Sequence, residues 1–94
     1  MRVFSFLAGN VRKELHDPLV LFWTFNPESR LVEIKGEGPY EDVMVHGDTL
    51  DRAVETLERE VLPCLWEDYA NEDDARLSLR ARALKADFLS RVAP

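Results

Sequence analysis

The sequence predicts an α+β fold, in which an antiparallel sheet of three to four strands is covered by two to three C-terminal helices in a two-layer sandwich. Two observations support this prediction. Residues 1–47 contain all four glycines and alternate polar with branched or aromatic residues, which is typical of strands. Residues 48–94 lack glycine and repeat apolar residues at helical spacing. Since each half needs the apolar face of the other, we expect a single domain over residues 1–94.

A β-hairpin is the clearest element of the first half. Residues 19–25 are branched or aromatic, residues 30–35 alternate, and the sequence Asn-Pro-Glu-Ser between them favours a turn. If those four residues form the loop, Trp23 lies opposite Val32. The apolar face of this hairpin should then be buried, with Trp23 and Phe25 as core residues.

Two further strands are expected beside the hairpin. Residues 2–7 alternate, and we expect Phe4 and Phe6 to point inward. Residues 41–46 also alternate and should form another strand. Residues 10–17 fit either a capped helical turn or a polar strand.

The first predicted helix follows the sheet. Asp48 or Thr49 is its candidate N-cap, and apolar residues continue at helical spacing to about residue 70. Pro63 interrupts this pattern. We expect a kink or a break there, because proline lacks the amide hydrogen and its ring clashes with the preceding turn. Leu57 lies in the apolar stripe and is a candidate core residue.

The last helix is expected to begin at Asn71, an amino acid that caps helix N-termini well. The acidic residues that follow would occupy its first turn, where they favour the helix dipole. Phe88 is the leading core candidate of this helix. Its predicted apolar stripe consists of Leu77, Ala81, Leu84, Phe88 and Val92.

Composition limits the classes of function. Eighteen acidic residues against twelve Lys and Arg give a net charge of −6, so the overall positive charge of a typical nucleic-acid-binding protein is missing. The single cysteine, Cys64, excludes an internal disulfide and a multi-cysteine zinc site. The apolar runs are shorter than a secretory signal or a membrane span requires. We therefore expect a cytoplasmic protein that does not bind membranes, and no motif predicts a reaction, a metal or a cofactor.

An acidic segment is the main candidate for a binding site. Five carboxylates fall within residues 67–74, beside two aromatic residues that could anchor a basic protein partner. The predicted function is a small non-catalytic protein–protein interaction module of the adaptor, inhibitor or small-chaperone type. Its predicted partner-binding residues are Trp66, Glu67, Asp68, Tyr69, Glu72, Asp73 and Asp74.

The last helix also predicts a homodimer. Besides its main apolar stripe it has a second side with small or apolar residues, on which another helix could approach closely. A two-fold dimer is the commonest closed assembly. The predicted interface residues are Ala75, Leu79, Ala83 and Ala86.

Two alternative functions stay open. A nucleic-acid-associated protein would use a stripe of arginines on the last helix, although ion pairs within the molecule, to acids of the preceding helix, are the favoured interpretation. A small enzyme or ligand binder would use His16 or His46 in a pocket between protomers, although neither has a metal-binding spacing. The arginines are Arg76, Arg80 and Arg91, and the acids of the preceding helix are Glu55, Glu58 and Glu60.

Overall fold

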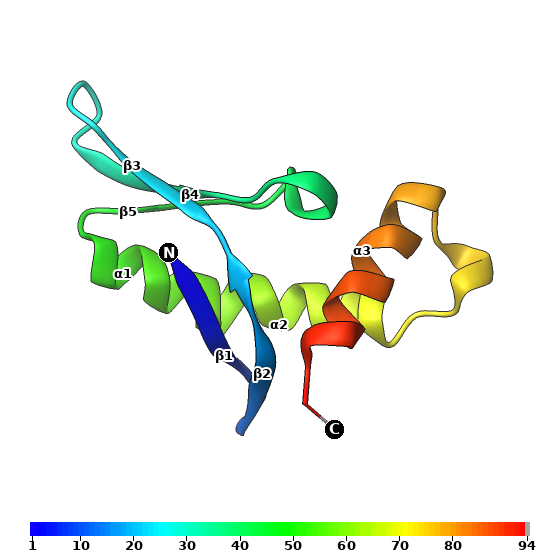
Figure 1. The fold of residues 1–94 in the computed structure, drawn as a ribbon. Coiled ribbons are helices and arrows are strands. Elements are labelled where there is room, and N and C mark those ends of the chain that lie inside the picture. Colours follow the sequence, from blue (N-terminus) through cyan, green and yellow to red (C-terminus); the bar gives the residue numbers. More distant parts are fainter. Residues whose placement is uncertain (94) are drawn as a thin grey trace.

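The computed structural model describes residues 1–93 and confirms the predicted α+β class (Figure 1). Within these residues, five strands form two antiparallel sheets, β1–β2 and β3–β4–β5, where the sequence predicted one sheet of three to four strands. The additional strand arises because residues 10–17, which fitted a turn or a strand, lie mostly in the long strand β2. The strands are β1 (Arg2–Ala8), β2 (Val11–Val20), β3 (Phe22–Asn26), β4 (Leu31–Lys35) and β5 (Met44–Gly47).

A long helical segment contacts both sheets and leads into a last helix that packs near its end (Figure 1). The first turns of the segment contact β4 and β5, and its middle contacts β1. The last helix contacts β2 and the end of the long segment. The long segment consists of α1 (Leu50–Thr56), the π-helical turn η2 (Leu57–Val61), α2 (Leu62–Leu65) and the π-helical turn η3 (Trp66–Ala70). Three further elements are the 3₁₀ turns η1 (Gly38–Tyr40) and η4 (Asp74–Arg76), and the last helix α3 (Leu79–Arg91).

The predicted inward direction of Phe4 is wrong, whereas that of Phe6 is confirmed. Phe6 is fully buried, but the side chain of Phe4 is 57% exposed. The pairing of β1 with β2 is irregular between Val3 and Ser5. Between the pairs Val3–Leu19 and Ser5–Glu14, β1 advances by two residues and β2 by five, and an irregularity of this kind disturbs the alternation of faces. Val3 and Phe6 are therefore both buried, although strict alternation would place them on opposite faces.

The predicted register of the hairpin is wrong by two residues. Trp23 pairs with Ile34 instead of Val32, because the loop consists of residues 27–30 and Asn26 belongs to β3. The side-chain oxygen of Asn26 accepts hydrogen bonds from the backbone N–H groups of Glu28 (3.0 Å) and Ser29 (3.4 Å), which stabilises this loop. A shift of two residues keeps each side chain on the face that the sequence predicted.

The predicted burial of Trp23 and Phe25 is nevertheless wrong, since both side chains are exposed. Their cross-strand neighbours Ile34 and Val32 are buried. The difference arises because the helices pack on β4 and β5, whereas β3 is the edge strand on the other side of the sheet. The hairpin projects past α1 (Figure 1).

The long helical segment continues through Pro63 without the break that was one predicted outcome. The turn before the proline is π-helical, and the N–H of Leu62 donates to the carbonyl of Leu57. A π-helical turn is wider than an α-helical turn. It therefore relieves the clash between a proline ring and the carbonyl four residues earlier. The predicted N-cap Thr49 is confirmed, because its hydroxyl accepts from the N–H of Arg52 at 3.2 Å.

The predicted start of the last helix at Asn71 is wrong. Asp73 instead caps the short turn η4, and α3 begins only at Leu79, where the hydroxyl of Ser78 accepts from the N–H of Ala81 at 3.1 Å. The predicted core position of Phe88 on this helix is confirmed. The residues that follow this helix pair with β2, since Ala93 donates its N–H to the carbonyl of Glu14 at 2.8 Å.

Aromatic residues from four elements meet in the core. The ring centre of Phe88 lies 5.3 Å from that of Phe6, 6.1 Å from that of Trp66 and 6.5 Å from that of Tyr40. Leu57, as predicted, is buried in the same core. This cluster joins α3 to β1, η1 and η3, so the last helix completes the core.

Gly47 sits where β5 and α1 approach each other closely, and we predict that its replacement by alanine destabilises the fold. A Cβ atom on Gly47 would lie 2.6 Å from the backbone nitrogen of Ala53 and 3.0 Å from its Cα. The expected loss is about 1–3 kcal/mol in the free energy of unfolding, measured by chemical denaturation. Gly9→Asn is the control, because Gly9 has open space around it and asparagine tolerates its φ of 66°. Equal losses for the two variants would contradict the predicted collision.

Candidate functional site

The two aromatic residues of the predicted acidic docking site belong to the interior more than to the surface. Trp66 is half-buried and packs against Phe6, with 5.9 Å between ring centres, and the ammonium group of Lys13 lies 5.1 Å from its ring centre. Tyr69 is half-buried and lines a cavity. Both side chains are thus occupied by contacts within the molecule.

Among the five carboxylates of this segment, those of Glu67 and Asp68 belong to exposed residues on η3. The other three serve local structure. Glu72 accepts the backbone N–H of Asp73 at 3.0 Å, and Asp73 accepts that of Ala75 at 3.1 Å. Lys85 donates to Asp74 at 2.8 Å and to the carbonyl of Glu72 at 2.6 Å, and its hydrogen bond lowers the pKa of Asp74. The acidic docking site stays a prediction. Asp73 and Asp74 are exposed like Glu67 and Asp68, but their carboxylates already bind the N–H of Ala75 and the ammonium group of Lys85.

The predicted dimer residues of the last helix are placed on the surface. Leu79 is 82% exposed. Ala83 and Ala86 are also exposed on α3, whereas Ala75 belongs to the separate turn η4. Three of the four residues thus lie on one helix, and their role as an interface stays a prediction.

The arginine stripe is only partly available to a nucleic acid. Arg76 is exposed, whereas Arg80 binds Glu41 and Asp42. The expectation of ion pairs within the molecule is confirmed for Arg80 and also for Arg91. The predicted partners in the preceding helix are wrong, because Arg80 meets the two acids that directly follow η1, and Arg91 meets Asp17 of β2 and Asp87 of α3 itself.

Arg91 is part of a half-buried polar cluster. It donates to Asp87 at 2.8 Å and to the carbonyl of Pro18 at 2.8 Å, and Asp17 lies 3.3 Å away. The hydroxyl of Tyr40 donates to the same carboxylate of Asp87 at 2.6 Å. Burial, reinforced by this hydrogen bond, raises the pKa of Tyr40 well above its ordinary value. Burial also acts to raise the pKa of Asp87, but the hydrogen bonds from Arg91 and Tyr40 outweigh it and hold this pKa below its ordinary value.

The two histidines and the cysteine make none of the contacts described for this cluster. His16 is exposed, and His46 is hydrogen-bonded to Glu33 at 2.8 Å on the outer face of the sheet. Cys64 is exposed on α2. Across residues 1–93, no group of three or more His, Cys, Asp or Glu side chains is arranged to hold a metal ion.

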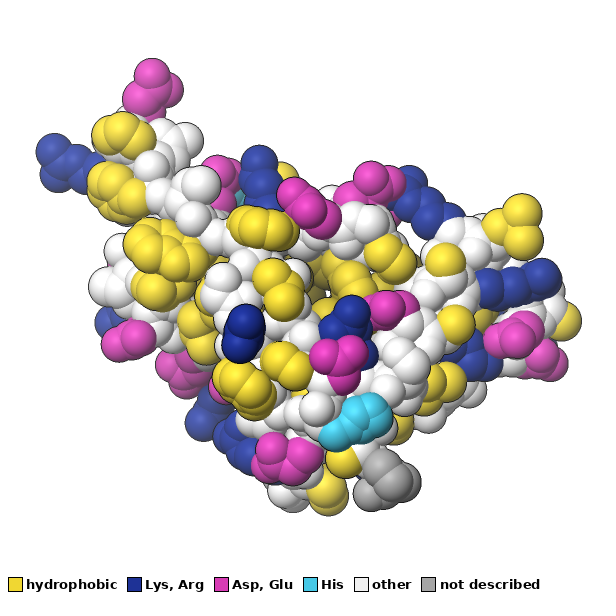
Figure 2. Space-filling model, in the orientation of Figure 1, with side chains coloured by type: hydrophobic (Ala, Val, Ile, Leu, Met, Phe, Trp, Pro, Cys, Tyr) yellow, Lys and Arg dark blue, Asp and Glu magenta, His cyan; other side chains and the backbone are white. Residues whose placement is uncertain are grey.

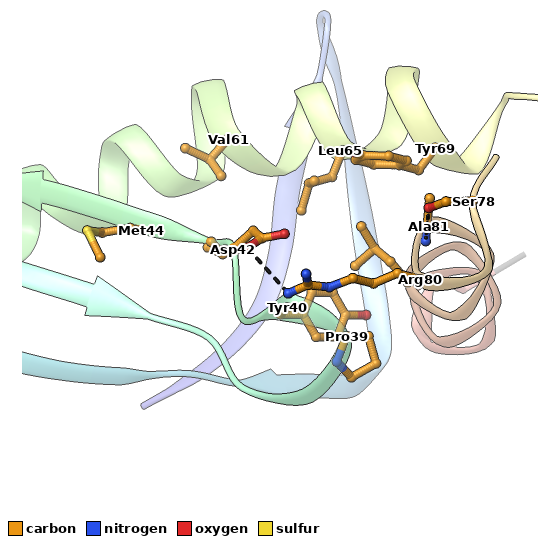
Figure 3. Close-up of a pocket in the computed structure, with 12 residues that line it drawn as sticks. Pro39, Tyr40, Asp42, Met44, Val61, Leu65, Tyr69, Ser78, Arg80 and Ala81 are labelled. Carbon is orange, nitrogen blue, oxygen red and sulfur yellow. Dashed lines mark hydrogen bonds and ion pairs between the residues drawn. The ribbon is translucent and has the colours of Figure 1, made fainter. Parts of the chain in front are cut away.

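A cavity of about 290 Å³ opens between η1, the long helical segment and the start of α3 (Figure 3). Val61, Leu65 and Leu84 give it apolar walls. Arg80 reaches across its rim to Asp42 at 3.4 Å, as the dashed line in Figure 3 marks. Its volume is near the lower end of the range for small-molecule sites. Neither histidine lines it, so the predicted histidine pocket finds no counterpart in this cavity.

The edge strand β3 exposes three aromatic side chains, and sequence reasoning missed this surface. Phe22 is 48%, Trp23 47% and Phe25 54% exposed. Trp23 and Phe25 lie on the face of the sheet that the helices cover at β4 and β5. Phe22 lies on the opposite face. It belongs to the same cross-strand row as Met44, which is also exposed. Hydrophobic side chains gather along the projecting hairpin and beside it in Figure 2.

The sequence around β3 carries a signal of this surface. Residues 19–27 contain no charged residue, and β3 has aromatic residues on both faces, although Phe22 shares its face with the polar residues Thr24 and Asn26. A strand covered on one face normally alternates apolar and polar residues. Natural edge strands carry lysine, proline or a bulge that prevents pairing with other chains. β3 contains neither residue, and its pairing with β4 is regular.

In the part of the chain that the structure describes, the helices are all too short or too polar to cross a membrane. No family model, curated protein or solved structure matches this chain.

Proposed function

We propose that the chain is a non-catalytic protein-interaction module that binds an extended, apolar polypeptide segment along β3. The observation that carries this proposal is the exposure of three aromatic side chains on an uncharged edge strand. Exposed apolar patches of this kind mark interaction sites on soluble proteins. An edge strand also offers a row of backbone donors and acceptors to a strand of another chain.

When a partner strand pairs along a sheet edge, two kinds of contact contribute to its binding. The backbone hydrogen bonds supply affinity, and the side chains on either face supply specificity. Trp23 and Phe25 on one face, and Phe22 on the other, are of the aromatic type that is enriched in interface cores. An adaptor or inhibitor would use this edge to hold its partner.

The acidic residues Glu67 and Asp68 offer a second contact in this proposal. The net charge of −6 favours partners without excess negative charge, and exposed carboxylates accelerate the approach of a basic protein. The proposed location is the cytoplasm, where a single exposed thiol such as Cys64 stays reduced.

The test captures partners from the host lysate with a tagged chain and compares two variants. Trp23→Ser/Phe25→Ser removes aromatic side chains from β3, and Leu79→Ser is the matched control, because it removes an apolar side chain that is even more exposed. We expect recovery of the captured protein to fall at least about tenfold with the β3 variant and to stay unchanged with the control. Equal recovery with both variants would overturn the proposal.

The acidic contact is tested in the same assay with Glu67→Lys/Asp68→Lys. We expect a smaller loss than for the β3 variant, together with a weaker dependence on salt, because exposed charges chiefly affect the rate of association. Thermal unfolding of each variant checks that its fold is intact.

A further inference from the structure

The cavity beside Arg80 lies between three parts of the fold that are far apart in the sequence. Its walls come from η1 and the residues after it, from the long helical segment, and from the start of α3 (Figure 3). None of the residues that line it belongs to β3, so this site is separate from the edge strand of the proposed function. Small-molecule sites begin at about 300 Å³. A cavity of about 290 Å³ therefore suits a compound with a single ring or a short branched chain.

The walls of the cavity are largely apolar. Val61 and Leu65 line it from the long helical segment, and Leu84 lines it from α3. Tyr69, which is half-buried, adds an aromatic ring beside Leu65 (Figure 3). Apolar walls with a few polar groups are typical of pockets for small organic molecules. An aromatic ring in the wall also favours an aromatic ring in the ligand.

The charges at the rim indicate which apolar compounds fit. Arg80 forms ion pairs with Glu41 and Asp42, so one guanidinium faces two carboxylates and one negative charge is in excess. The contact between Arg80 and Asp42, at 3.4 Å, is long for a hydrogen bond, and the side chain of Asp42 is 85% exposed. The carboxylate of Asp42 therefore has room for a second donor.

We propose that this cavity binds a small apolar ammonium compound, with its ring or branched chain between the apolar walls and its protonated amine at Asp42. A carboxylate ligand with the same apolar body is disfavoured, because it would bring a third negative charge to the rim or displace Glu41 or Asp42 from Arg80. The net charge of −6 acts in the same direction, since it attracts cations and repels anions.

Titration of the nitrogen-15-labelled chain with three matched probes, followed by backbone amide NMR, tests the site and its charge preference. The probes are 2-phenylethylammonium, its neutral analogue 2-phenylethanol, and its anionic counterpart 3-phenylpropanoate. We expect the ammonium compound to bind with a dissociation constant of about 1 mM. It should bind about two- to fivefold more tightly than the alcohol, the gain that an exposed ion pair gives, and the carboxylate should bind most weakly.

The amide signals that move should belong to residues of the cavity wall, such as Leu65, Tyr69 and Ala81. The proposal is overturned if none of the three probes binds, if the carboxylate binds most tightly, or if the signals that move belong to β3 instead.

The position of the ligand is tested by filling the cavity. Ala81 lines it, whereas Ala83 is exposed on the same helix, so Ala81→Phe and Ala83→Phe add the same ring inside and outside. We expect Ala81→Phe to abolish binding of 2-phenylethylammonium and Ala83→Phe to leave it unchanged. Equal binding by the two variants, with both folded by circular dichroism, overturns the position.

The role of the carboxylate is tested by Asp42→Asn, which leaves the cavity walls intact. The matched control is Asp51→Asn, because Asp51 is exposed on α1 and does not line the cavity. In Asp42→Asn the preference for the ammonium compound over the alcohol should disappear, while the affinity for the alcohol stays the same. Asp51→Asn should keep the preference. A preference that survives Asp42→Asn overturns the assignment of this carboxylate.

Thermal unfolding gives a second measurement that needs no variant. A ligand in the cavity packs against η1, the long helical segment and α3 at once, an arrangement that only the folded chain has. Binding to the folded state alone raises the unfolding temperature as the ligand concentration rises. We expect a rise of several degrees when 2-phenylethylammonium is present at about ten times its dissociation constant. An unfolding temperature that stays the same at this concentration overturns binding to the folded cavity.

Discussion

Replacing Phe88 by alanine is expected to lower the free energy of unfolding by roughly 3–5 kcal/mol, a large share of the roughly 5–15 kcal/mol that stabilises a domain. Phe88 is fully buried and contacts the rings of Phe6, Tyr40 and Trp66. The truncation leaves a cavity where α3 meets both the sheet and the long helical segment. Urea denaturation followed by circular dichroism measures the loss.

Trp23→Ala is the control for this prediction. The sequence pattern alone made both Trp23 and Phe88 core candidates, but the side chain of Trp23 is half exposed. We expect its truncation to cost about 1 kcal/mol or less. A loss for Trp23→Ala that equals the loss for Phe88→Ala would contradict the position of β3 outside the helical cover.

Replacing Asp87 by asparagine is expected to cost about 1.5–3 kcal/mol at neutral pH, because its carboxylate accepts charge-assisted hydrogen bonds. The donors are Arg91 (2.8 Å) and the buried hydroxyl of Tyr40 (2.6 Å). Tyr40→Phe removes one of the two bonds and should cost less. Chemical denaturation of both variants at neutral pH measures the difference.

The pH dependence of this loss has a definite sign. The pKa of Asp87 is lowered in the folded state, because the hydrogen bonds from Arg91 and Tyr40 outweigh the effect of burial. The stabilisation is thus complete above the unfolded-state pKa of about 3.9 and is lost as the pH falls through the lower folded-state pKa. The stabilities of the wild type and of Asp87→Asn should therefore converge as the pH falls through the folded-state pKa of Asp87. A difference in stability that stays constant from neutral to strongly acidic pH would contradict the assigned role of the carboxylate.

The types of the elements could be predicted from the sequence because they depend on local periodicity. The switch from alternation to helical spacing near residue 48 located the sheet and the helices, and it identified Leu57 and Phe88 as core residues. The start of the last helix was harder to predict, because Asn71 and Ser78 are both residue types that cap helix N-termini well. Only the extended backbone around Ser78 decides where α3 begins.

The exposed surface of β3 could not be predicted because periodicity defines the faces of a strand but not how far a helix extends over them. Trp23 and Phe25 were correctly assigned to the helix-facing side, yet the long helical segment makes its main contacts to that sheet with β4 and β5. Phe4 was misplaced for a different reason, since a strand irregularity has no distinct sequence pattern here. The uncharged run over residues 19–27 was visible in the sequence, but it suggests burial as readily as binding.

The contact between the two ends of the fold has a consequence for biosynthesis. Val92 forms a bridge with Leu15, and Phe88 completes the core around Phe6. A ribosome releases the N-terminal strands first, and they lack these partners until α3 has emerged from the exit tunnel. The core around Phe6 and Leu15 therefore stays incomplete in the nascent chain after the sheets and the long helical segment have emerged, and it closes only when residues 84–92 are free.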